Sequence, residues 1–488
     1  MKLVVMKFGG TSVGSIESID QSTNIIVEQS KIWEAVAVVV SAMTGVTDAL
    51  ICGAETAASG DEVTYKSIAA TLLARHREVI EKLVLQKEQP EIISVITEFI
   101  GEFSNLCSAV STLGEITLRA MDTIVSFGER MNAPVIAAVL RNKGIASASV
   151  SAKNLIVTDS NFQKAMPMMD ETRAQTQKVL FPLLEKKTVP VITGFIGANK
   201  AGNITTLGRG GSDYSGALMG TSLDASEVWI WTDVDGVMTT DPRIVKDAHV
   251  IPILSANEIS ELAYFGAKVL HPKTIWPVIE RDIPLWVKNT FNPKFPGTKI
   301  IREPEAAEGK VKAVTIIKKL SLVTVEGRGM MGVPGIAART FACVARQKAS
   351  VLMISQASSE QSICFVIPTD SVPKVIKELE TEFALELDHA DINRVWSMDN
   401  IVIVTVVGTA IRSTSGLASK IFGALGAAKI NIIAIAQGSS EYSISVIVDA
   451  DTGDEAVRQI HAEVINCSRD GSSRVVPTSP QSATKEII

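Results

Sequence analysis

Short apolar runs alternate with longer stretches of helical spacing over residues 1–302. The apolar runs are typical of strands, and they are KLVVMKF, AVAVVVSA, VPVITGFIG, EVWIWT and IPLWVKN. Residues 62–125 are rich in Ala, Leu, Glu and Lys at helical spacing, which predicts a helical insertion beside a sheet. This order of strands and helices is typical of an α/β domain.

The second half of the chain contains an internal duplication. Residues 335–366 align without gaps on residues 416–447, at a constant offset of 81 and with eleven identities. Each copy is preceded by a strand-like run, LSLVTVEG or IVIVTVVG. Counted from that run, the predicted order of elements is strand, helix, strand, strand, with a further helix after them. This order predicts two small βαββαβ domains, whose edge strands can pair within the chain or across a dimer.

Two polar segments divide the chain. The first, Ile301 to Lys312, carries Pro and Gly and predicts a linker, and residues 468–486 are rich in Ser, Thr and Pro, which predicts a mobile tail. The predicted organisation is an α/β domain at 1–302, a linker at 303–312, duplicated domains at 313–390 and 391–467, and a tail at 468–488.

Composition narrows the class of protein. A chain of 488 residues with 46% apolar content predicts at least two cores. Five cysteines without CxxC spacing indicate neither a disulfide framework nor a zinc site. The net charge of -6 provides no overall basic footprint for nucleic acid, so small-molecule chemistry is favoured. Because the N-terminus has no secretory apolar region and no apolar run approaches the length of a membrane span, we expect a cytoplasmic protein without a membrane partner.

Three glycine-rich segments carry the candidate chemistry. They are KFGGTSVG at Lys7 to Gly14, LGRGGSDYSG at 207–216 and WTDVDGVMTTDPR at 231–243. Glycines let backbone N–H groups approach an anion closely, and hydroxyl and basic side chains add further donors. No GxxxxGK[ST] loop occurs, and we find no GxGxxG run that opens a helix directly after a strand, so phosphate must be bound in another way. Taken alone, the segment at Lys7 is equally compatible with an ordinary turn and a solvated lysine.

Five motifs in series identify a family. In order, KFGGTSVG, SFGER (126–130), TLGRGGSDYSG (206–216), WTDVDGVMTTDPR and FGAKVLHP (265–272) resemble aspartate kinase of the amino-acid kinase superfamily. The duplicated segment looks like the paired ACT regulatory domains of that family, and the resemblance extends from Lys2 to about Cys467. It implies an α/β fold, with a three-layer αβα kinase domain on a mainly parallel sheet and then two ferredoxin-like βαββαβ ACT domains.

The implied reaction transfers the γ-phosphoryl group of ATP to the side-chain carboxylate of L-aspartate. The product is 4-phospho-L-aspartate, on the route to lysine, threonine and methionine. A carboxylate with a pKa of about 3.9 is ionised at neutral pH, so its oxygen attacks without a general base. Positioning and positive charge must then supply the catalysis. The resemblance assigns this positioning and charge stabilisation to Lys7, Lys268 and Asp213. It also implies Mg²⁺ that bridges phosphate oxygens, without a dedicated metal site formed by protein side chains.

The resemblance also implies a pocket for aspartate. Arg209 should pair with a substrate carboxylate, Ser212 and Thr47 should hydrogen-bond to it, and Glu129 should hold the ammonium group.

Three of the proposed site residues have structural alternatives. Glu129 with Ser126 fits a helix capping box, and Asp213 or Ser212 could cap a helix N-terminus. Trp229 and Trp231 alternate on a strand and are interpreted as core residues rather than base platforms.

Nucleotide contacts are implied around the same motifs. Met238 stands where relatives often carry a tyrosine, and its thioether can still cover a purine face. The implied contacts are Lys7, Gly9, Gly10, Thr232, Asp233, Met238, Asp241, Pro242, Arg243 and Lys268.

The duplicated domains suggest regulation by an amino acid. Gln356 and Gln437 each begin a QxSSE pattern at a strand end, where a carboxamide can donate and accept hydrogen bonds. The pattern resembles threonine-sensitive aspartate kinases, so threonine is the favoured effector and lysine the second. Alternatively, both glutamines satisfy edge-strand backbone groups. A homo-oligomer, dimer or tetramer, is expected through the ACT domains.

Other functions remain open at this point. Because no dinucleotide-binding region follows the second copy, we expect a monofunctional kinase rather than a kinase–dehydrogenase. A kinase acting on glutamate or a nucleotide is a second possibility. A catalytically silent amino-acid sensor on the same scaffold is a third.

Overall fold

The computed structural model describes residues 1–266, 270, 272–303, 311–356, 361–437 and 441–466. The chain divides into two compact units. The first unit comprises Met1–Val237, Val250–Ala263 and Lys268–Glu305, and the second comprises Met238–His249, Tyr264–Ala267 and Ala306–Ile488. The predicted tail at 468–488 lies outside the described residues.

The first unit is built on an eight-stranded sheet in the order β3-β5-β2-β1-β8-β10-β11-β9. Its neighbouring strands pair in parallel except β10 and β11, which are antiparallel. The central strands β1 and β2 are buried along their whole length, because apolar side chains fill both faces. The strands are β1 (Leu3–Phe8), β2 (Ala35–Val40), β3 (Ser147–Val150), β5 (Val189–Thr193), β8 (Glu227–Thr232), β9 (Ile253–Ser255), β10 (Leu285–Asn289) and β11 (Thr298–Ile301).

Helices cover both faces of this sheet. Val4, Met6 and Phe8 lie in a core with α6, whereas Lys7, which alternates with them, lies against α8. This three-layer αβα arrangement confirms the predicted fold class. A small second sheet joins β4 (Val157–Thr158), β6 (Ile196–Asn199) and β7 (Ile204–Thr206). The covering helices are α1 (Ile16–Gln29) and α6 (Phe127–Asn142) on one face, and α7 (Met169–Glu185), α8 (Gly211–Ser222) and α10 (Pro272–Ile279) on the other.

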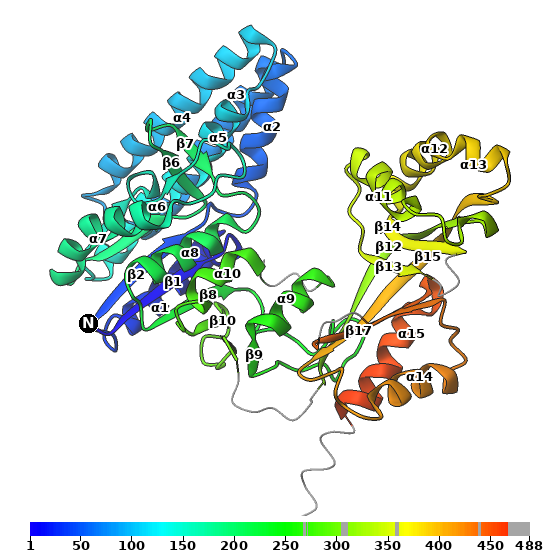
Figure 1. Cartoon of the computed structure of the whole chain (residues 1–488). Helices are drawn as coiled ribbons and strands as arrows, with labels where there is room; N and C mark the ends of the chain where they lie inside the picture. Colours follow the sequence, from blue (N-terminus) through cyan, green and yellow to red (C-terminus); the bar gives the residue numbers. More distant parts are fainter. Residues whose placement is uncertain (267–269, 271, 304–310, 357–360, 438–440, 467–488) are drawn as a thin grey trace, which may run out of the picture. The chain divides into compact units, whose positions relative to one another are not determined.

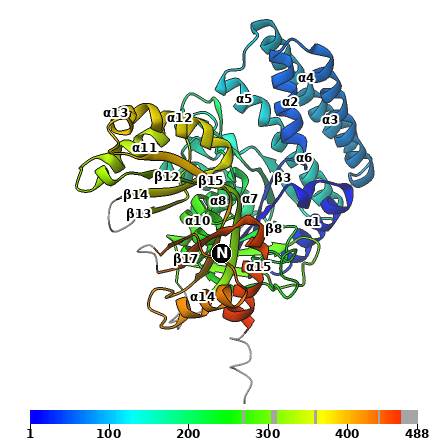
Figure 2. The same ribbon diagram turned by 90° about the vertical axis from the view of Figure 1, so that its right-hand side faces the viewer.

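The predicted helical insertion is confirmed. Figures 1 and 2 show α2 (Val46–Ala58), α3 (Glu62–Leu83) and α4 (Gln89–Leu113) as a bundle, followed by the short α5 (Leu118–Val125). Among the described residues, α4 is long and apolar enough to cross a membrane by length and composition, contrary to the expectation that no such run exists. One face of α4, including Ile96, Phe103 and Cys107, packs into the core with α2, α3 and α6, which accounts for its apolar character.

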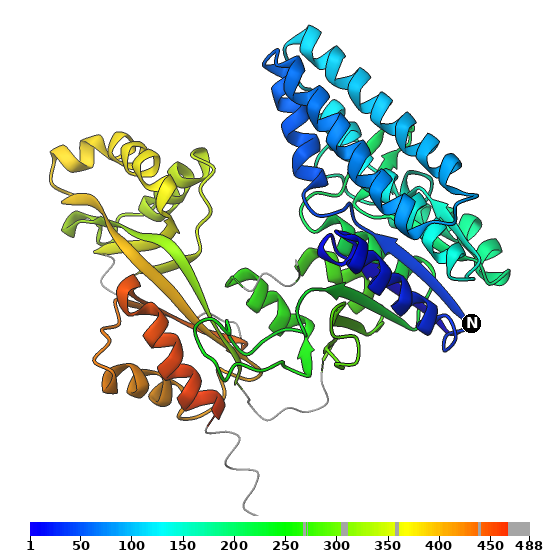
Figure 3. The same cartoon turned by 180° about the vertical axis from the view of Figure 1, so that it is seen from behind.

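The second unit contains one antiparallel six-stranded sheet in the order β13-β14-β12-β15-β17-β16. Figures 1 and 3 show two long strands, β12 and β15, that run through both halves of this sheet. The strands are β12 (Val311–Glu326), β13 (Met353–Gln356), β14 (Ser362–Pro368), β15 (Arg394–Gly408), β16 (Ala434–Ala436) and β17 (Ser443–Asp449). The helices are α11 (Ile336–Arg346), α12 (Val372–Glu382), α13 (Ala384–Asp388), α14 (Leu417–Ala427) and α15 (Ala450–His461). The helix α9 (Ala256–Tyr264) belongs to the first unit except for its last residue, Tyr264, which is part of the second unit.

The two long strands join the duplicated modules. Residues 320–326 of β12 pair with residues 394–401 of β15 in the first module, and residues 311–317 pair with residues 403–408 in the second. The second module therefore takes its fourth strand from the start of β12 rather than from residues after α15. One shared apolar cluster, including Leu322, Met353 and Ile447, links the modules, and β13 packs against β16.

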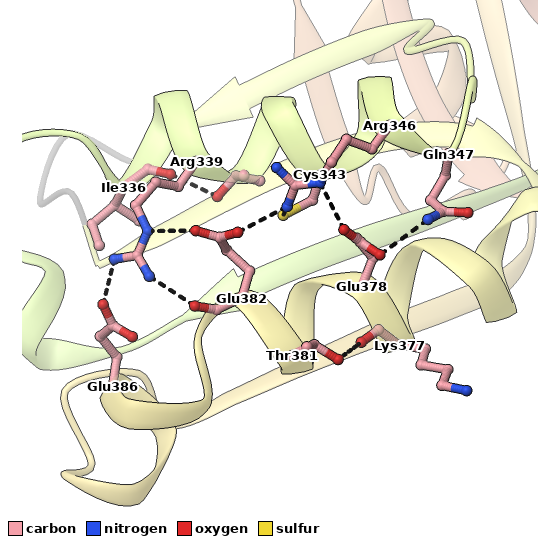
Figure 4. Close-up of polar contacts among 11 residues, drawn as sticks. Ile336, Arg339, Cys343, Arg346, Gln347, Lys377, Glu378, Thr381, Glu382 and Glu386 are labelled. Atoms are coloured by element: carbon pink, nitrogen blue, oxygen red, sulfur yellow. Dashed lines mark hydrogen bonds and ion pairs between the residues drawn. The ribbon is translucent and has the colours of Figure 1, made fainter.

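An ion-pair network covers the outer helices of the first module (Figure 4). The Arg339 guanidinium pairs with Glu382 and Glu386, and Arg346 pairs with Glu378 and again with Glu382. These contacts join α11 to α12 and α13. Beneath them, Phe365 and Phe383 fill the core of this module.

Candidate functional site

A cavity of about 870 Å³ lies in the first unit, where β1 and β2 end and α2, α6 and α8 begin. The carboxyl ends of parallel strands form the usual binding edge of an open α/β sheet. The structure brings together there the predicted residues Lys7, Gly10, Thr47, Glu129, Arg209, Ser212 and Asp213.

Lys7 joins β1 to the first turn of α8. Its Nζ lies 2.5 Å from Asp213 Oδ1, and the lysine is only 7% exposed. Gly216 allows this approach, because a Cβ atom there would lie 3.1 Å from the Lys7 Cβ. A cation and an anion are thus paired at the cavity wall, where the surroundings screen them less than water does.

The N-terminus of α8 has no side-chain cap. The predicted capping roles of Ser212 and Asp213 are wrong, because both residues lie inside the helix and its N-cap is Gly210 at φ 73°. Glycine adopts this left-handed conformation without strain but has no side chain to accept from the first N–H groups. The Gly211 N–H donates to the Gly208 carbonyl at 2.9 Å, which leaves the N–H groups of Ser212 and Asp213 for an anion in the cavity.

Glu129 is a buried carboxyl group at the start of α6. It is 3% exposed, and its Oε1 accepts a hydrogen bond from the Ala42 N–H at 3.1 Å. Burial raises the pKa of Glu129 to about 8, while the Ala42 hydrogen bond and the Lys7 charge act in the opposite direction. Among the described residues, its Oε2 has no hydrogen-bond partner. A cationic ligand group would satisfy this oxygen.

The capping-box alternative for Glu129 is wrong. Ser126 makes no side-chain cap, and its hydroxyl instead donates to the Thr123 carbonyl at 2.6 Å. Gly128 has a packing role in the same motif, because a Cβ atom there would lie 2.7 Å from the Ala42 Cβ. The glycine brings α6 close enough for Glu129 to reach the Ala42 backbone.

Exposed Arg209 and partly buried Thr47 also line the cavity. Gly208 at φ 76° and Gly210 at φ 73° flank Arg209, and both conformations favour glycine. Thr47 lies in the first turn of α2, whose N-cap is the left-handed Gly45. Basic and hydroxyl donors therefore lie at the same cavity as the buried acid Glu129.

Two residues that support the cavity carry no motif and were missed by sequence reasoning. Arg75 on α3 donates to the carbonyl groups of Thr44 and Gly14, at 2.7 Å each, and so ties two of the site loops together. Asp122 on α5 lines the cavity itself. Both act on segments more than thirty residues away, which a local pattern does not reveal.

The predicted nucleotide contacts are divided between the units. Gly9 donates its N–H to the Trp231 carbonyl at 3.0 Å, and Thr232 donates to Asp233 Oδ1 at 3.1 Å, both in the first unit. Neither Thr232 nor Asp233 lines the cavity described above. The other predicted contacts, Met238, Asp241, Pro242 and Arg243, belong to the second unit, and Lys268 lies outside the described residues.

The segment Met238–His249 is anchored within the second unit. The Thr239 carbonyl accepts from the Val314 N–H at 2.8 Å, and the Thr239 hydroxyl lies 3.0 Å from His461 Nε2. In the same segment, the Arg243 guanidinium pairs with Asp241 at 2.6 Å, and this contact lowers the pKa of Asp241.

The structure also shows where two other groups of predicted residues lie, namely the two tryptophans of β8 and the two glutamines of the duplicated modules. Trp231 is 2% exposed and stacks on Phe8 with ring centroids 5.9 Å apart, as expected for a core residue. Trp229 is partly buried against the same core. Gln356 ends β13 and Gln437 follows β16, so the two exposed glutamines lie at the ends of strands that pack together.

Comparisons with known proteins decide the family. Residues 2–289 match the amino acid kinase family, and residues 323–383 and 404–464 each match the ACT domain. The chain belongs to the amino acid kinase family. The family match contains the segments Met238–His249 and Tyr264–Ala267, which the fold places in the second unit.

Relatives of known name are aspartokinases. The chain is 37% identical over 468 residues to bifunctional aspartokinase/homoserine dehydrogenase 1 of Arabidopsis thaliana, covering 94% of this chain and 50% of that protein. It is 32% identical over 472 residues to Arabidopsis aspartokinase 1, covering 94% and 79%. The chain thus spans about half the length of the bifunctional relatives.

Solved structures show the same architecture. Escherichia coli aspartokinase III in complex with aspartate and ADP is 28% identical, with a TM-score of 0.77 over 95% of this chain and 100% of that chain. The same enzyme in complex with lysine and aspartate gives a TM-score of 0.79 at the same identity.

Proposed function

We propose that this protein is an aspartate kinase that transfers the γ-phosphoryl group of ATP to the side-chain carboxylate of L-aspartate. The observation that carries the proposal is the cavity that combines exposed Arg209 with buried Glu129 and its unpartnered Oε2. Aspartate offers a carboxylate to the first and an ammonium group to the second. The related E. coli structure that contains aspartate and ADP supports this choice of substrates.

In the proposed mechanism, the aspartate carboxylate attacks without a general base, because it is already ionised at neutral pH. Arg209, Ser212 and Thr47 hold the substrate, and Glu129 receives its ammonium group. Lys7 neutralises charge between the two anionic reactants, with Asp213 fixing the position of its Nζ. The uncapped N–H groups of α8 contribute further donors for an anion.

Magnesium fits this site as a partner of ATP. Mg²⁺ keeps several water ligands and binds through phosphates and one or two carboxylates. No group of three or more potential ligand side chains occurs within the described residues, and Asp213 is one of the carboxylates at the cavity that could contact the ion. When bound, Mg²⁺ neutralises charge on the phosphates. Thr232, Asp233, Met238, Asp241, Pro242, Arg243 and Lys268 remain the proposed nucleotide contacts.

An assay separates this function from its alternatives. The protein is incubated with ATP, Mg²⁺ and either aspartate, glutamate or no acceptor, and hydroxylamine traps any acyl phosphate. Product that depends on aspartate supports the proposal. Product with glutamate alone indicates a different amino-acid kinase. No product with either acceptor, together with binding of an amino acid, indicates a silent sensor.

Regulation by an amino acid is part of the proposal, with threonine favoured over lysine on the QxSSE pattern of the sequence. The neighbouring strand ends that carry Gln356 and Gln437 support an amino-acid site, and the related E. coli structure that contains lysine and aspartate keeps lysine as the second candidate. Titration calorimetry with each amino acid tests the choice. Absence of a threonine signal, or unchanged threonine affinity in Gln356→Ala and Gln437→Ala, contradicts it.

Assembly and location complete the proposal. We propose a cytoplasmic homo-oligomer, dimer or tetramer, formed through the ACT modules, whose edge strands β13 and β16 offer backbone groups. Light scattering measures the assembly directly, and a monomer at micromolar concentration contradicts it.

A further inference from the structure

A buried aspartate, Asp122, lines the candidate cavity but has no role in the mechanism above. It lies on α5, its residue is fully buried, and it comes seven residues before Glu129. Burial raises the pKa of Asp122, and hydrogen bonds from Gln163 and Thr206 act against this rise. A buried carboxyl group at a cavity either binds a ligand or holds other parts of the protein in place.

The hydrogen bonds of Asp122 favour the second role. The Gln163 N–H donates to both carboxylate oxygens, at 3.2 and 3.0 Å. The Thr206 N–H donates to Oδ2 at 2.9 Å, and the Thr206 hydroxyl donates to Oδ1 at 2.8 Å. A carboxylate offers about four acceptor positions. The protein itself therefore uses the acceptor capacity of Asp122, and little remains for a substrate.

The two segments that Asp122 holds meet beside the loop of Arg209. Thr206 ends β7 and lies three residues before Arg209. Gln163 adopts a left-handed backbone conformation at φ 68°, and its carbonyl oxygen lies 3.0 Å from where a Cβ atom on Gly208 would be. The Ala165 N–H also donates to the Thr206 carbonyl at 3.0 Å. Loss of the Asp122 carboxylate would release both supports of this loop.

We propose that Asp122 is a positioning residue for the acceptor substrate. Its carboxylate fixes Gln163 and Thr206 and thereby sets where Arg209 presents its guanidinium to the cavity. The inference rests on the proposed function, in which Arg209 binds a carboxylate of aspartate.

Two replacements of Asp122 distinguish geometry from charge. In Asp122→Asn, the amide oxygen can take the place of Oδ2 and accept from the Gln163 and Thr206 N–H groups, while the amide nitrogen can donate to the Thr206 hydroxyl oxygen. The hydrogen-bonded arrangement survives without the negative charge. In Asp122→Ala, all of these bonds are lost.

Steady-state kinetics of the full chain, with aspartate and ATP varied separately, provide the test. We expect Asp122→Ala to raise the KM for aspartate roughly tenfold or more, since misplacement of a binding group is costly, with the KM for ATP changed less than about twofold. Asp122→Asn should remain within about threefold of the parent protein. An equal rise for both substrates in Asp122→Ala, no rise, or an Asp122→Asn protein as impaired as Asp122→Ala overturns the proposal.

A second measurement does not depend on activity. Hydrogen exchange of the unliganded protein should be faster at the Gln163 and Thr206 amides in Asp122→Ala than in the parent or Asp122→Asn. Unchanged exchange in Asp122→Ala contradicts the positioning role, even if the parent protein does not phosphorylate aspartate and the proposed function itself fails. Asp61→Ala is the matched control, because Asp61 accepts comparable bonds from Thr64 on the exposed start of α3 and does not line the cavity.

Discussion

Two acidic residues of the cavity, Glu129 and Asp213, differ in the partners that their carboxylate oxygens have. Glu129 has one oxygen on the Ala42 backbone and one without a partner among the described residues, whereas Asp213 is paired with Lys7. An unpaired carboxylate is costly to bury, so the unliganded protein favours the neutral form of Glu129. A substrate ammonium would reverse that preference.

We expect the affinity for aspartate to rise with pH. The pKa of Glu129 is raised to about 8 in the folded protein from an ordinary value of 4.5, so its contribution to stability is complete below 4.5 and is lost as the pH rises through 8. Binding of an ammonium group requires the ionised form and therefore releases a proton near neutral pH. The KM for aspartate should fall by up to about tenfold per pH unit between pH 6 and 8.

Titration calorimetry at pH 7 in buffers of different ionisation enthalpy measures the released proton. Glu129→Gln, which keeps the shape of the side chain, is the control and should abolish both the proton release and the pH dependence. A KM for aspartate that is flat from pH 6 to 8 in the parent protein contradicts this role for Glu129.

Lys7 should affect turnover more than binding of aspartate. Replacement of Lys7 by Met removes the buried cation at the cavity and should lower kcat by about 10²–10³-fold, the usual scale for a preorganised electrostatic group. Coupled measurement of ADP release checks this. Lys2→Met, near the other end of β1, should leave kcat unchanged, and full turnover by the Lys7→Met protein would refute the mechanism.

At the scale of elements, two helices that begin at the cavity, α2 and α8, have no side-chain cap, as is also true of α11 and α14 in the second unit. The N-caps of α2 and α8 are left-handed glycines without a side-chain acceptor, whereas α3 and α5 have capping hydrogen bonds from Asp61 and Thr117. A cap stabilises the helix end but occupies its donors. The uncapped α2 and α8 therefore leave donors for a ligand at the cavity.

The helices of the first ACT module depend on charge for part of their stability. Arg339 lowers the pKa of Glu382 and of Glu386, so the stabilisation is complete above their ordinary value of 4.5 and is lost as the pH falls below it. We expect Arg339→Ala to lower the midpoint of thermal unfolding at pH 7. The difference from the parent should shrink in high salt and at pH 4.

The duplication provides a matched control for this ion-pair network. Lys420 occupies the position equivalent to Arg339 in the second module, and Ala427 replaces Arg346. Calorimetry of Lys420→Ala should show a smaller change in the unfolding midpoint than Arg339→Ala. Equal changes in the unfolding midpoint for the two variants would mean that the ion-pair network does not stabilise the first module and that Arg339→Ala acts only through loss of a surface cation.

At the scale of the whole molecule, the residues that match the kinase family and the residues that form the first compact unit have different boundaries. The segment Met238–His249 lies inside the kinase family match but belongs to the second unit. Ile244 and Val245 pack there against the core of the second ACT module, and Phe265 packs against the cluster shared by both modules. Motif residues inside the kinase family match are thus held by elements of the ACT modules.

Under the proposed function, in which Asp241 and Arg243 contact the nucleotide, this placement connects His461 to nucleotide binding. Burial lowers the pKa of His461, which favours the neutral ring beside Thr239. We expect His461→Ala to raise the KM for ATP by about fivefold, the scale of one hydrogen bond, with little change in the KM for aspartate. His461→Gln can place an amide nitrogen where Nε2 lies and should restore most of the affinity for ATP.

The exposed His389→Ala serves as the control for a general loss of stability. If His461→Ala changes the KM values for ATP and aspartate equally, or changes neither, the anchoring of Met238–His249 has no bearing on the nucleotide.

The sequence predicted the elements well because their signals are local. Apolar runs located β1, β2, β5, β8 and β10, and the constant offset of 81 revealed a duplicated module. The motifs also identified several charged and polar residues of the cavity, namely Lys7, Glu129, Arg209, Ser212 and Asp213. The capping alternatives at Ser126 and Ser212 are wrong, because the Ser126 hydroxyl donates backward to the Thr123 carbonyl and α8 begins one residue before Ser212, and the local sequence reveals neither fact.

By itself, then, the sequence determined the strand and helix pattern, the duplication and the residue types of the site. Only the tertiary structure decided that Asp122 holds Gln163 and Thr206, that β12 serves both modules, and that Thr239 contacts His461. Each of these joins residues separated by dozens to hundreds of positions. Their pairing depends on how buried surfaces pack in three dimensions, and no local spacing along the chain encodes it.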